Sequence, residues 1–143
     1  MALVDILTAS SAHAGSIQIL LQQLGYQCEV AEIISAIDTP DANSDLFVAI
    51  NHGEVVGFMS LIYFFYFPLQ KRNCRITALV VDEHARSTGV GKKLINHALG
   101  QAKKLSCAQL EVTTSLAREA TQAYYERVGF IKSSFRYYLD VGI

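Results

Sequence analysis

A run of sixteen residues without a formal charge, VVGFMSLIYFFYFPLQ at positions 55–70, restricts the fold more than any other part of this 143-residue chain. Such a run is buried either in lipid or in a protein core. A membrane-spanning helix needs roughly 20 apolar residues, and Pro68 lies near the end of this run. Its aromatic and β-branched residues favour a buried strand instead. The N-terminal MALVDILTAS has no basic segment before an apolar stretch, so we expect no secretory signal, no membrane association and a cytosolic (cytoplasmic) location.

Charge and cysteine content exclude several classes of ligand. Twelve Lys and Arg face 13 Asp and Glu, for a net charge of -1, which lacks the basic excess of a nucleic-acid-binding protein. Cys28, Cys74 and Cys107 are odd in number and far apart, which matches neither a disulfide framework nor a structural zinc site. We expect them to be buried or partly buried free thiols. The four histidines have no helical ligand spacing, so no metal site is expected.

Hydrophobic periodicity predicts a single α/β domain over residues 1–143. The expected elements are, in order, a strand over 3–7, helices ending at Gly25 and before Pro40, a hairpin from Leu46 through the uncharged run, a strand over 73–82, a helix over 94–105, a strand over 108–114, a helix over 116–127, and strands around 130–131 and 135–141. This order, βααβββαβαββ, favours helices on both faces and parallel strands in the later half of the sheet. A sheet covered on both faces accounts for the 51% hydrophobic content.

Residues 79–94, LVVDEHARSTGVGKKL, place a glycine-containing loop between a strand and a helix. The first N–H groups of a helix are unpaired and its dipole is positive there, so such a junction binds phosphate where the backbone can come close. Gly89 and Gly91 allow that approach, and Arg86 and Lys92 add positive charge. The spacing differs from both the dinucleotide GxGxxG and the P-loop. It indicates another pyrophosphate ligand, the alternative being a purely structural turn.

A second segment, REATQAYYERVGF at 118–130, predicts an amphipathic helix. One face carries the packing residues Leu116, Ala120, Ala123 and Tyr124. Arg118, Gln122 and Tyr125 lie on another face, so Tyr125 and Arg118 are expected to point together into a cleft. Gly129 is expected to end the helix, and Phe130 to start the next strand.

On these two segments, the chain resembles the GNAT superfamily of acetyl-coenzyme A dependent N-acetyltransferases. RSTGVG matches the [Q/R]xxGx[G/A] pyrophosphate loop of that superfamily, and AYYERVGF looks like its AxxFYExxGF signature, in the expected order and at the expected distance. The resemblance covers nearly the whole chain and implies a mixed central sheet with helices on both faces. A narrower likeness is to the small aminoalkylphosphonate and aminoglycoside N-acetyltransferases.

The resemblance also implies roles for individual residues. The backbone of Leu79, Val80 and Val81 would hydrogen-bond the pantetheine arm like an added strand, in a slot opened where this strand splays from AQLEVTT. The pyrophosphate would be cradled by Arg86, Ser87, Thr88, Gly89, Val90, Gly91 and Lys92. Tyr125 would be the general acid that protonates the departing coenzyme A thiolate, since a phenol of pKa about 10 is protonated at pH 7. Arg118 stands where many relatives carry an Asn near pantetheine.

The implied reaction is direct attack of a neutral amine on the thioester, and it leaves the general base unassigned. Many members carry a Glu near the position of Ala78, where this chain reads Arg75, Ile76, Thr77 and Ala78. Glu111 on the neighbouring strand is a candidate base, the alternative being a solvated or structurally paired carboxylate. Neither Cys74 nor Cys107 has a base nearby in sequence, so no acetyl-cysteine intermediate is expected.

The expected acceptor is a small-molecule amine. An acidic run, Glu29, Glu32, Asp38, Asp41 and Asp45, suits a cationic amine, whereas Lys71, Arg72 and Arg75 suit an anionic one. Some of the aromatic residues at 63–67 are expected to line the acceptor site or the contact of a homodimer. Two alternatives stay open: acetylation of a protein N-terminus or lysine, and an acetyl-coenzyme A binding module without turnover.

Overall fold

The computed structural model describes residues 3–143 and divides the chain into two compact units, residues 1–112 and 113–143. The two units are described separately below. A single domain over residues 1–143 remains a prediction.

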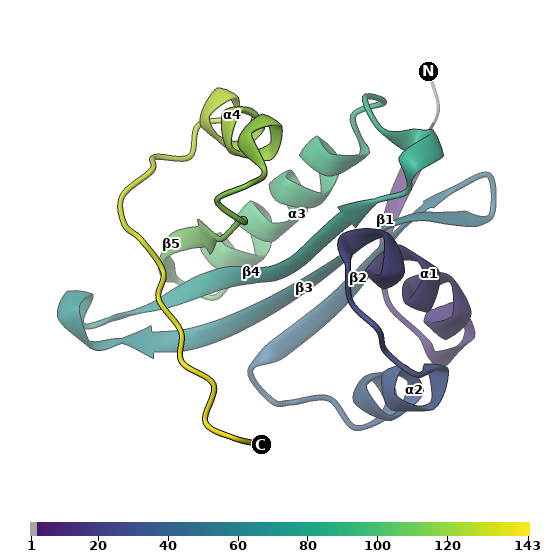
Figure 1. Ribbon diagram of the computed structural model, residues 1–143, viewed down its shortest axis with the longest axis horizontal. Helices are drawn as coiled ribbons and strands as arrows, with labels where there is room; N and C mark the ends of the chain where they lie inside the picture. The colour runs from purple at the N-terminus through teal and green to yellow at the C-terminus, as the bar shows by residue number, and fades with distance from the viewer. Residues whose placement is uncertain (1–2) are drawn as a thin grey trace. The chain divides into compact units, whose positions relative to one another are not determined.

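The first unit is built on a five-stranded sheet in the order β1-β2-β3-β4-β5 (Figure 1). Its strands are β1 (Val4–Thr8), β2 (Ser44–Asn51), β3 (Glu54–Tyr66), β4 (Lys71–Val81) and β5 (Cys107–Val112). The pairs from β1 to β4 are antiparallel, and β4 pairs with β5 in parallel. A mixed sheet with a parallel later part is confirmed. The sheet is nevertheless mostly antiparallel, because tight turns join β2 to β3 and β3 to β4, and tight turns reverse the chain.

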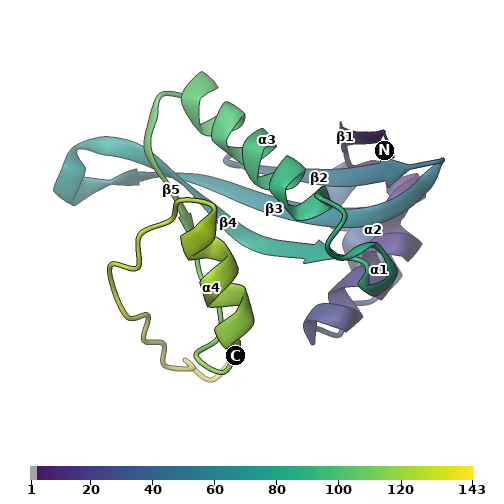
Figure 2. The same ribbon diagram turned by 90° about the horizontal axis from the view of Figure 1, so that it is seen from above.

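Helices cover both faces of this sheet, as the sequence predicted. The helices α1 (Ala14–Leu24) and α2 (Val30–Asp38) lie on one face, and α3 (Val90–Lys104) lies on the other (Figure 2). Short 3-10 turns occur at Ser11–His13, Phe67–Leu69 and Glu83–Ala85. A Cβ atom placed on Gly57 of β3 would lie 3.1 Å from side-chain atoms of both Leu94 and Val90. The glycine therefore lets α3 pack closely against the sheet.

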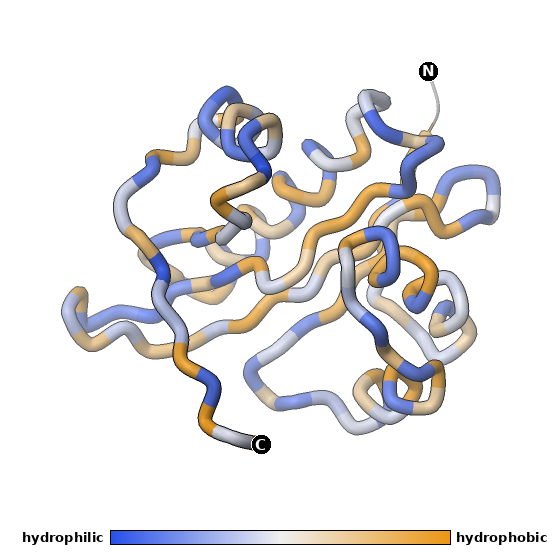
Figure 3. Tube along the Cα trace, viewed as in Figure 1, coloured by the Kyte–Doolittle hydropathy of each residue, from blue (hydrophilic) through white to orange (hydrophobic). Residues whose placement is uncertain are grey.

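Residues 55–66 of the uncharged run belong to β3, and both faces of this strand are covered along its middle. Phe58 joins the core cluster under α1 and α2, whereas Met59 and Leu61 are fully buried. Figure 3 shows apolar residues along β3 and along the later half of β4, with polar residues at the turn that joins β2 to β3. Alternate residues of this strand point to opposite faces, so a doubly covered strand reads as a continuous apolar run. No helix within residues 3–143 is long and apolar enough to cross a membrane.

The aromatic residues at the end of β3 divide into buried and exposed side chains. Tyr63 is 5% exposed, and its hydroxyl donates a 2.7 Å hydrogen bond to Asp45 Oδ2. Phe65 and Phe67 are 58% and 75% exposed. Tyr63 is therefore a core residue, and a contact of Phe65 and Phe67 with an acceptor or a second copy remains a prediction.

The second unit contains one helix, α4 (Glu119–Arg127). Gly129, with φ +110°, ends it as predicted: the N–H of Phe130 donates to the Tyr125 carbonyl. The helix begins at Glu119 rather than at Leu116, because the Arg118 N–H donates to the Ser115 carbonyl in a turn before it. Leu116 is 79% exposed, so its placement on the packing face was wrong.

The strands predicted around residues 130–131 and 135–141 were also wrong. Residues 129–143 form neither helix nor strand, so the described order of elements ends at βααβββαβα. The side chains of Ile131, Phe135 and Tyr137 are exposed. A strand forms only where a neighbour completes its ladder of backbone hydrogen bonds, and the β propensity of these residues does not supply that neighbour.

Candidate active site

A β-bulge interrupts β4 at Thr77. Ser60 of β3 pairs with Ala78 and Leu61 pairs with Ile76, which leaves Thr77 without a counterpart. The Thr77 hydroxyl donates a 2.8 Å hydrogen bond to Ser60 Oγ. The extra residue changes the face to which later side chains point, so Ala78 packs against the core cluster under α1 and α2.

Beyond the bulge, one edge of β4 has no strand partner. The pairing of β4 with β5 ends at Ile76 and Val112, while β4 continues to Val81. Within residues 3–112, no strand pairs with this edge from Thr77 onward. The pairing stops where β5 itself ends, at Val112, so the splaying of β4 from AQLEVTT that the family resemblance implies remains a prediction.

In an antiparallel pair, the backbone N–H and C=O groups of successive residues point alternately toward the partner strand and away from it, which identifies the residues whose groups face this free edge. The Asp82 N–H donates to the Val56 carbonyl of β3 at 2.8 Å, so the backbone of Val80 also faces β3. The N–H and C=O groups of Leu79 and Val81 then face the free edge. Of the three residues expected to hold pantetheine, Leu79 and Val81 therefore have backbone groups on this edge, although the Val81 carbonyl already accepts from Arg86 Nε at 3.4 Å.

The loop after β4 leads into a helix whose first N–H groups have no side-chain cap. Gly89 precedes α3 with φ +90° and ψ 2°, and no side chain caps the helix. A Cβ atom on Gly89 would meet no heavy atom within 4 Å, so the space beside it is open. Its left-handed backbone nonetheless favours glycine. The Thr88 hydroxyl donates to the Ala85 carbonyl and holds the loop closed.

Positive charge at this helix start comes from Arg86 and Lys92. Both side chains are exposed, and Arg86 Nε lies 3.4 Å from the Val81 carbonyl oxygen. Lys93, by contrast, donates from Nζ to the Val4 carbonyl at 2.7 Å and is held against β1. Unpaired helical N–H groups, a positive helix end and two cations are the features that favour an anion, and binding of a pyrophosphate here remains a prediction.

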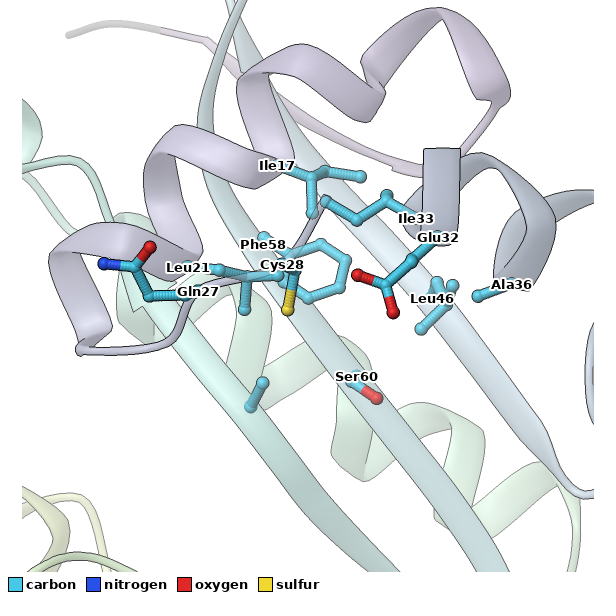
Figure 4. A pocket seen from close by; sticks show the side chains of 11 residues that line it. Ile17, Leu21, Gln27, Cys28, Glu32, Ile33, Ala36, Leu46, Phe58 and Ser60 are labelled. Atoms are coloured by element: carbon cyan, nitrogen blue, oxygen red, sulfur yellow. The ribbon is translucent and has the colours of Figure 1, made fainter. Parts of the chain in front are cut away.

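A pocket of about 330 Å³ opens between the helix pair α1–α2 and the sheet, next to Ala78 (Figure 4). Its lining consists of Ile17, Leu21, Gln27, Cys28, Glu32, Ile33, Ala36, Leu46, Phe58, Ser60 and Ala78. Glu32 is the one charged residue in this lining, and its carboxylate and the Cys28 thiol point into the pocket. Glu32 Oε1 accepts a 3.0 Å hydrogen bond from the Glu29 N–H.

The other members of the acidic and basic groups noted in the sequence do not line this pocket. Asp45 accepts from Tyr63, and Asp41 Oδ1 accepts from the Asn43 N–H at 2.9 Å. Lys71, Arg72 and Arg75 lie outside the lining, as do the aromatic residues at 63–67. The acidic run is therefore dispersed, and Glu32 is its contribution to the pocket.

Glu111, the candidate base, is a structurally paired carboxylate. Its Oε1 accepts from Arg75 Nε at 3.2 Å and from Arg75 Nη2 at 3.0 Å. Its Oε2 accepts from Asn73 Nδ2 at 2.8 Å, and Asn73 is fully buried. Because both oxygens are engaged, Glu111 is poorly placed to take a proton from an amine.

The cysteines are free thiols, buried or half-buried as predicted. Burial raises the pKa of Cys74 to about 12 and also raises the pKa of Cys107. A thiol is a nucleophile only as the thiolate. These two residues are accordingly unsuited to carry an acetyl group. No group of three or more His, Cys, Asp or Glu within residues 3–143 could hold a metal ion.

The second unit holds the other predicted site residues, Tyr125 and Arg118. Burial raises the pKa of Tyr125, although the charge of Arg118 acts in the opposite direction. The Tyr125 ring meets that of Phe130 edge to face, at 5.6 Å between centroids. Because its pKa is raised, Tyr125 is a protonated phenol at neutral pH. The neighbouring Gln122 donates to the Ser115 and Leu116 carbonyls, so its side chain is engaged in the turn before α4.

The sequence did not reveal a polar contact next to the loop that precedes α3. Gln23, at the end of α1, donates from Nε2 to Asp82 Oδ1 at 3.0 Å, directly after β4. The two residues are 59 positions apart, so no local pattern indicates their contact.

Comparison with known proteins extends these observations. The sequence profile of the Acetyltransferase (GNAT) family matches residues 17–130. The chain is 28% identical to an aminoalkylphosphonate N-acetyltransferase of Salmonella typhimurium, over 89% of this chain and 81% of that protein. It is 33% identical to the peptidyl-lysine N-acetyltransferase YjaB of the same organism, over 73% of this chain and 61% of that protein. A third relative, N-alpha-acetyltransferase 30 of Saccharomyces cerevisiae, is 34% identical over 50% of this chain and 44% of its own length.

Solved structures show the same fold at low sequence identity. An aminoglycoside N-acetyltransferase, AAC(6')-Iy in complex with CoA, superimposes with a TM-score of 0.86 at 16% identity, covering 100% of this chain and 97% of that chain. A transcriptional regulator from Bacillus halodurans gives a TM-score of 0.86 at 22% identity, covering 96% and 99% of the two chains. With a family profile that spans most of its length, this chain belongs to the GNAT acetyltransferase family.

Proposed function

We propose that this protein transfers the acetyl group of acetyl-coenzyme A to the primary amine of a small molecule, by direct attack. The observation that carries the proposal is the free edge of β4, which lies beside a pocket at Ala78 and is followed, after the loop 82–89, by the uncapped start of α3. An acyl donor and an acceptor can each be bound there by groups of residues 3–112.

The residues along this path suit the parts of acetyl-coenzyme A. Leu79 offers a backbone donor and acceptor, and Val81 a backbone donor, to an extended chain containing amides, as an added strand would require. The N–H groups at the start of α3, with Arg86 and Lys92, suit a pyrophosphate. Acetyl-coenzyme A would supply an activated acetyl group, and the free backbone N–H of β4 would polarise its carbonyl.

Tyr125 is proposed as the general acid. Its raised pKa keeps the phenol protonated at neutral pH, so it can give a proton to a departing thiolate. Arg118 is proposed to contact the coenzyme near the same group. The AYYERVGF segment and its family resemblance support the assignment of Tyr125, whereas Arg118 departs from the Asn that many relatives carry there.

The pocket supports an acceptor with an apolar body and a cationic amine. Its lining is largely aliphatic and aromatic, and Glu32 is its one charged side chain. A protonated amine is attracted by that carboxylate before it loses its proton and attacks. An aminophosphonate would bring a second negative charge to Glu32, so the substrate class of the Salmonella typhimurium relative is less well matched.

Acetylation of a protein N-terminus or lysine is the second candidate, favoured by the yeast and YjaB relatives. A pocket of about 330 Å³ has the size of a small-ligand site and favours the first candidate. A binding module without turnover is the third, and Tyr125 argues against it, because binding alone needs no acid.

The test is release of coenzyme A thiol from acetyl-coenzyme A with a panel of primary amines. The panel contains alkyl and arylalkyl amines, aminophosphonates, and peptides with a free N-terminus or lysine. We expect turnover with the arylalkyl amines above that with aminophosphonates and peptides. Preference for a peptide would select the second candidate. Binding of coenzyme A without turnover of any amine would select the third.

A further inference from the structure

A side-chain latch joins the end of α1 to the start of the phosphate-binding loop. Gln23 Nε2 donates to Asp82 Oδ1 at 3.0 Å, and Gln23 Oε1 accepts from the Glu83 N–H at 3.1 Å. Both polar ends of one amide are therefore engaged by consecutive residues. The partners are 59 and 60 positions away along the chain, so the contact is tertiary.

Asp82 also hydrogen-bonds the turn that follows it, so the contact with Gln23 restrains that turn as well. Its second oxygen, Oδ2, accepts from the His84 N–H at 3.0 Å, and its backbone N–H donates to the Val56 carbonyl of β3 at 2.8 Å. The hydrogen bond from Gln23 is the main reason that the pKa of Asp82 lies below its ordinary value. Asp82 is thus a charged acceptor held between helix, strand and turn.

The same helix lines the acceptor pocket. Ile17 and Leu21 of α1 and Cys28 just after it belong to the pocket lining. Arg86 and Gly89 follow the latched turn on the other side. Gln23 is therefore the direct polar link between the helix that faces the acceptor and the loop that faces the pyrophosphate.

We propose that Gln23 is a positioning residue for coenzyme A binding, which fixes the 82–86 turn against α1 and so links the acceptor pocket to the pyrophosphate loop. The inference rests on the proposed function, because it assumes that the loop binds coenzyme A. Gln23 itself touches neither reactant. Its effect is on the conformation from which Arg86 and the N–H groups of α3 bind.

The structure offers a matched set of variants. Gln23→Ala removes both hydrogen bonds. Gln22→Ala removes an exposed glutamine one position earlier, whose side chain makes no hydrogen bond within residues 3–143. Gln23→Glu keeps the acceptor for the Glu83 N–H but sets two carboxylates against each other. The double variant Gln23→Glu/Asp82→Asn reverses donor and acceptor: the amide introduced by Asp82→Asn would donate to the new carboxylate and still accept from the His84 N–H.

The measurement is the Kd of coenzyme A by calorimetry for the full chain, together with hydrogen exchange of the Glu83 amide. We expect both variants to weaken coenzyme A binding about tenfold, since Gln23→Ala loses two ordinary hydrogen bonds and Gln23→Glu replaces one of them by repulsion from Asp82. The Glu83 amide should exchange faster in Gln23→Ala. Gln22→Ala should bind as the wild type, and the double variant within about twofold of it. KM for acetyl-coenzyme A should rise in Gln23→Ala while kcat stays within about twofold.

Wild-type Kd in Gln23→Ala, or a double variant as weak as Gln23→Glu, would overturn the inference while leaving the proposed function intact. A wild-type protein that does not bind coenzyme A would overturn both. Thermal unfolding of each variant shows whether weaker binding reflects a loss of folded protein: an equal loss of binding in Gln22→Ala and Gln23→Ala at matched stability would also count against the latch.

Discussion

Arg75 Nη2 lies 3.0 Å from Glu111 Oε1, across the parallel pair of β4 and β5. With Asn73 on the other oxygen, this pair fixes Glu111 as part of the sheet. We expect Glu111→Gln to lower stability by about 0.5–1 kcal/mol, because the two charged side chains are 38% and 30% exposed and solvent weakens their attraction. Chemical denaturation measures the change. Arg75→Gln should cost a similar amount, and the double variant less than the sum.

The same variant tests the candidate base. If Glu111 only holds the sheet, the acidic limb of the kcat/KM profile against pH stays where it is in Glu111→Gln. Disappearance of that limb would identify Glu111 as the base and contradict a purely structural role.

Tyr125→Phe should lower kcat by about 100-fold, the lower range for loss of a general acid. The matched control is Tyr124→Phe, which removes the neighbouring hydroxyl of α4 and should leave kcat within about twofold. Because the acid must be protonated and burial raises its pKa above the ordinary 10.0, kcat should show no decline due to Tyr125 below about pH 10. Unchanged turnover in Tyr125→Phe would remove it from the mechanism.

Two glycines around α3 give opposite predictions for the same substitution. Gly89→Ala forces a Cβ into a backbone with φ +90° and should destabilise the fold by about 1 kcal/mol and weaken coenzyme A binding. Gly100→Ala, inside the helix with no neighbouring atom within 4 Å, should stabilise by about 0.5–1 kcal/mol. Thermal unfolding and the Kd of coenzyme A measure both. Equal stability changes at the two positions would contradict the role of the left-handed turn.

Glu32→Gln should raise KM for cationic amines about tenfold while leaving KM for acetyl-coenzyme A unchanged, because it removes the charge from the pocket and keeps its shape. Glu29→Gln is the control, an exposed carboxylate at the start of the same helix that does not line the pocket. Initial rates with an arylalkyl amine give KM for both variants, and only Glu32→Gln should raise it. A larger effect from Glu29→Gln would place the acceptor elsewhere.

The strands and helices of residues 3–112 follow from local patterns, and the sequence predicted them. The uncharged run became β3 because both of its faces are covered, and Gly25 ends α1 in a left-handed conformation, φ +104°, as expected. The segment 130–141 has the same local preference for strand but forms none, because a strand also needs a neighbour.

The parts of the site that the sequence did not reveal are tertiary. Thr77 is a bulge only because β3 and β4 pair in a register that skips it. Gln23 acts by holding Asp82, and Glu111 is unavailable as a base because Arg75 and Asn73 engage its two oxygens. Each of these depends on residues distant in sequence, for which a single chain carries no pattern.

The free edge of β4 has a consequence for handling the protein. Unpaired N–H and C=O groups along an apolar strand are a template for pairing with another chain. The free edge is short, from Thr77 to Val81, and the bulge at Thr77 twists the strand there. Both features limit pairing with another chain and hence aggregation. A bound coenzyme that occupied the edge would remove it, so the ligand-free protein should aggregate faster on storage than the protein kept with coenzyme A.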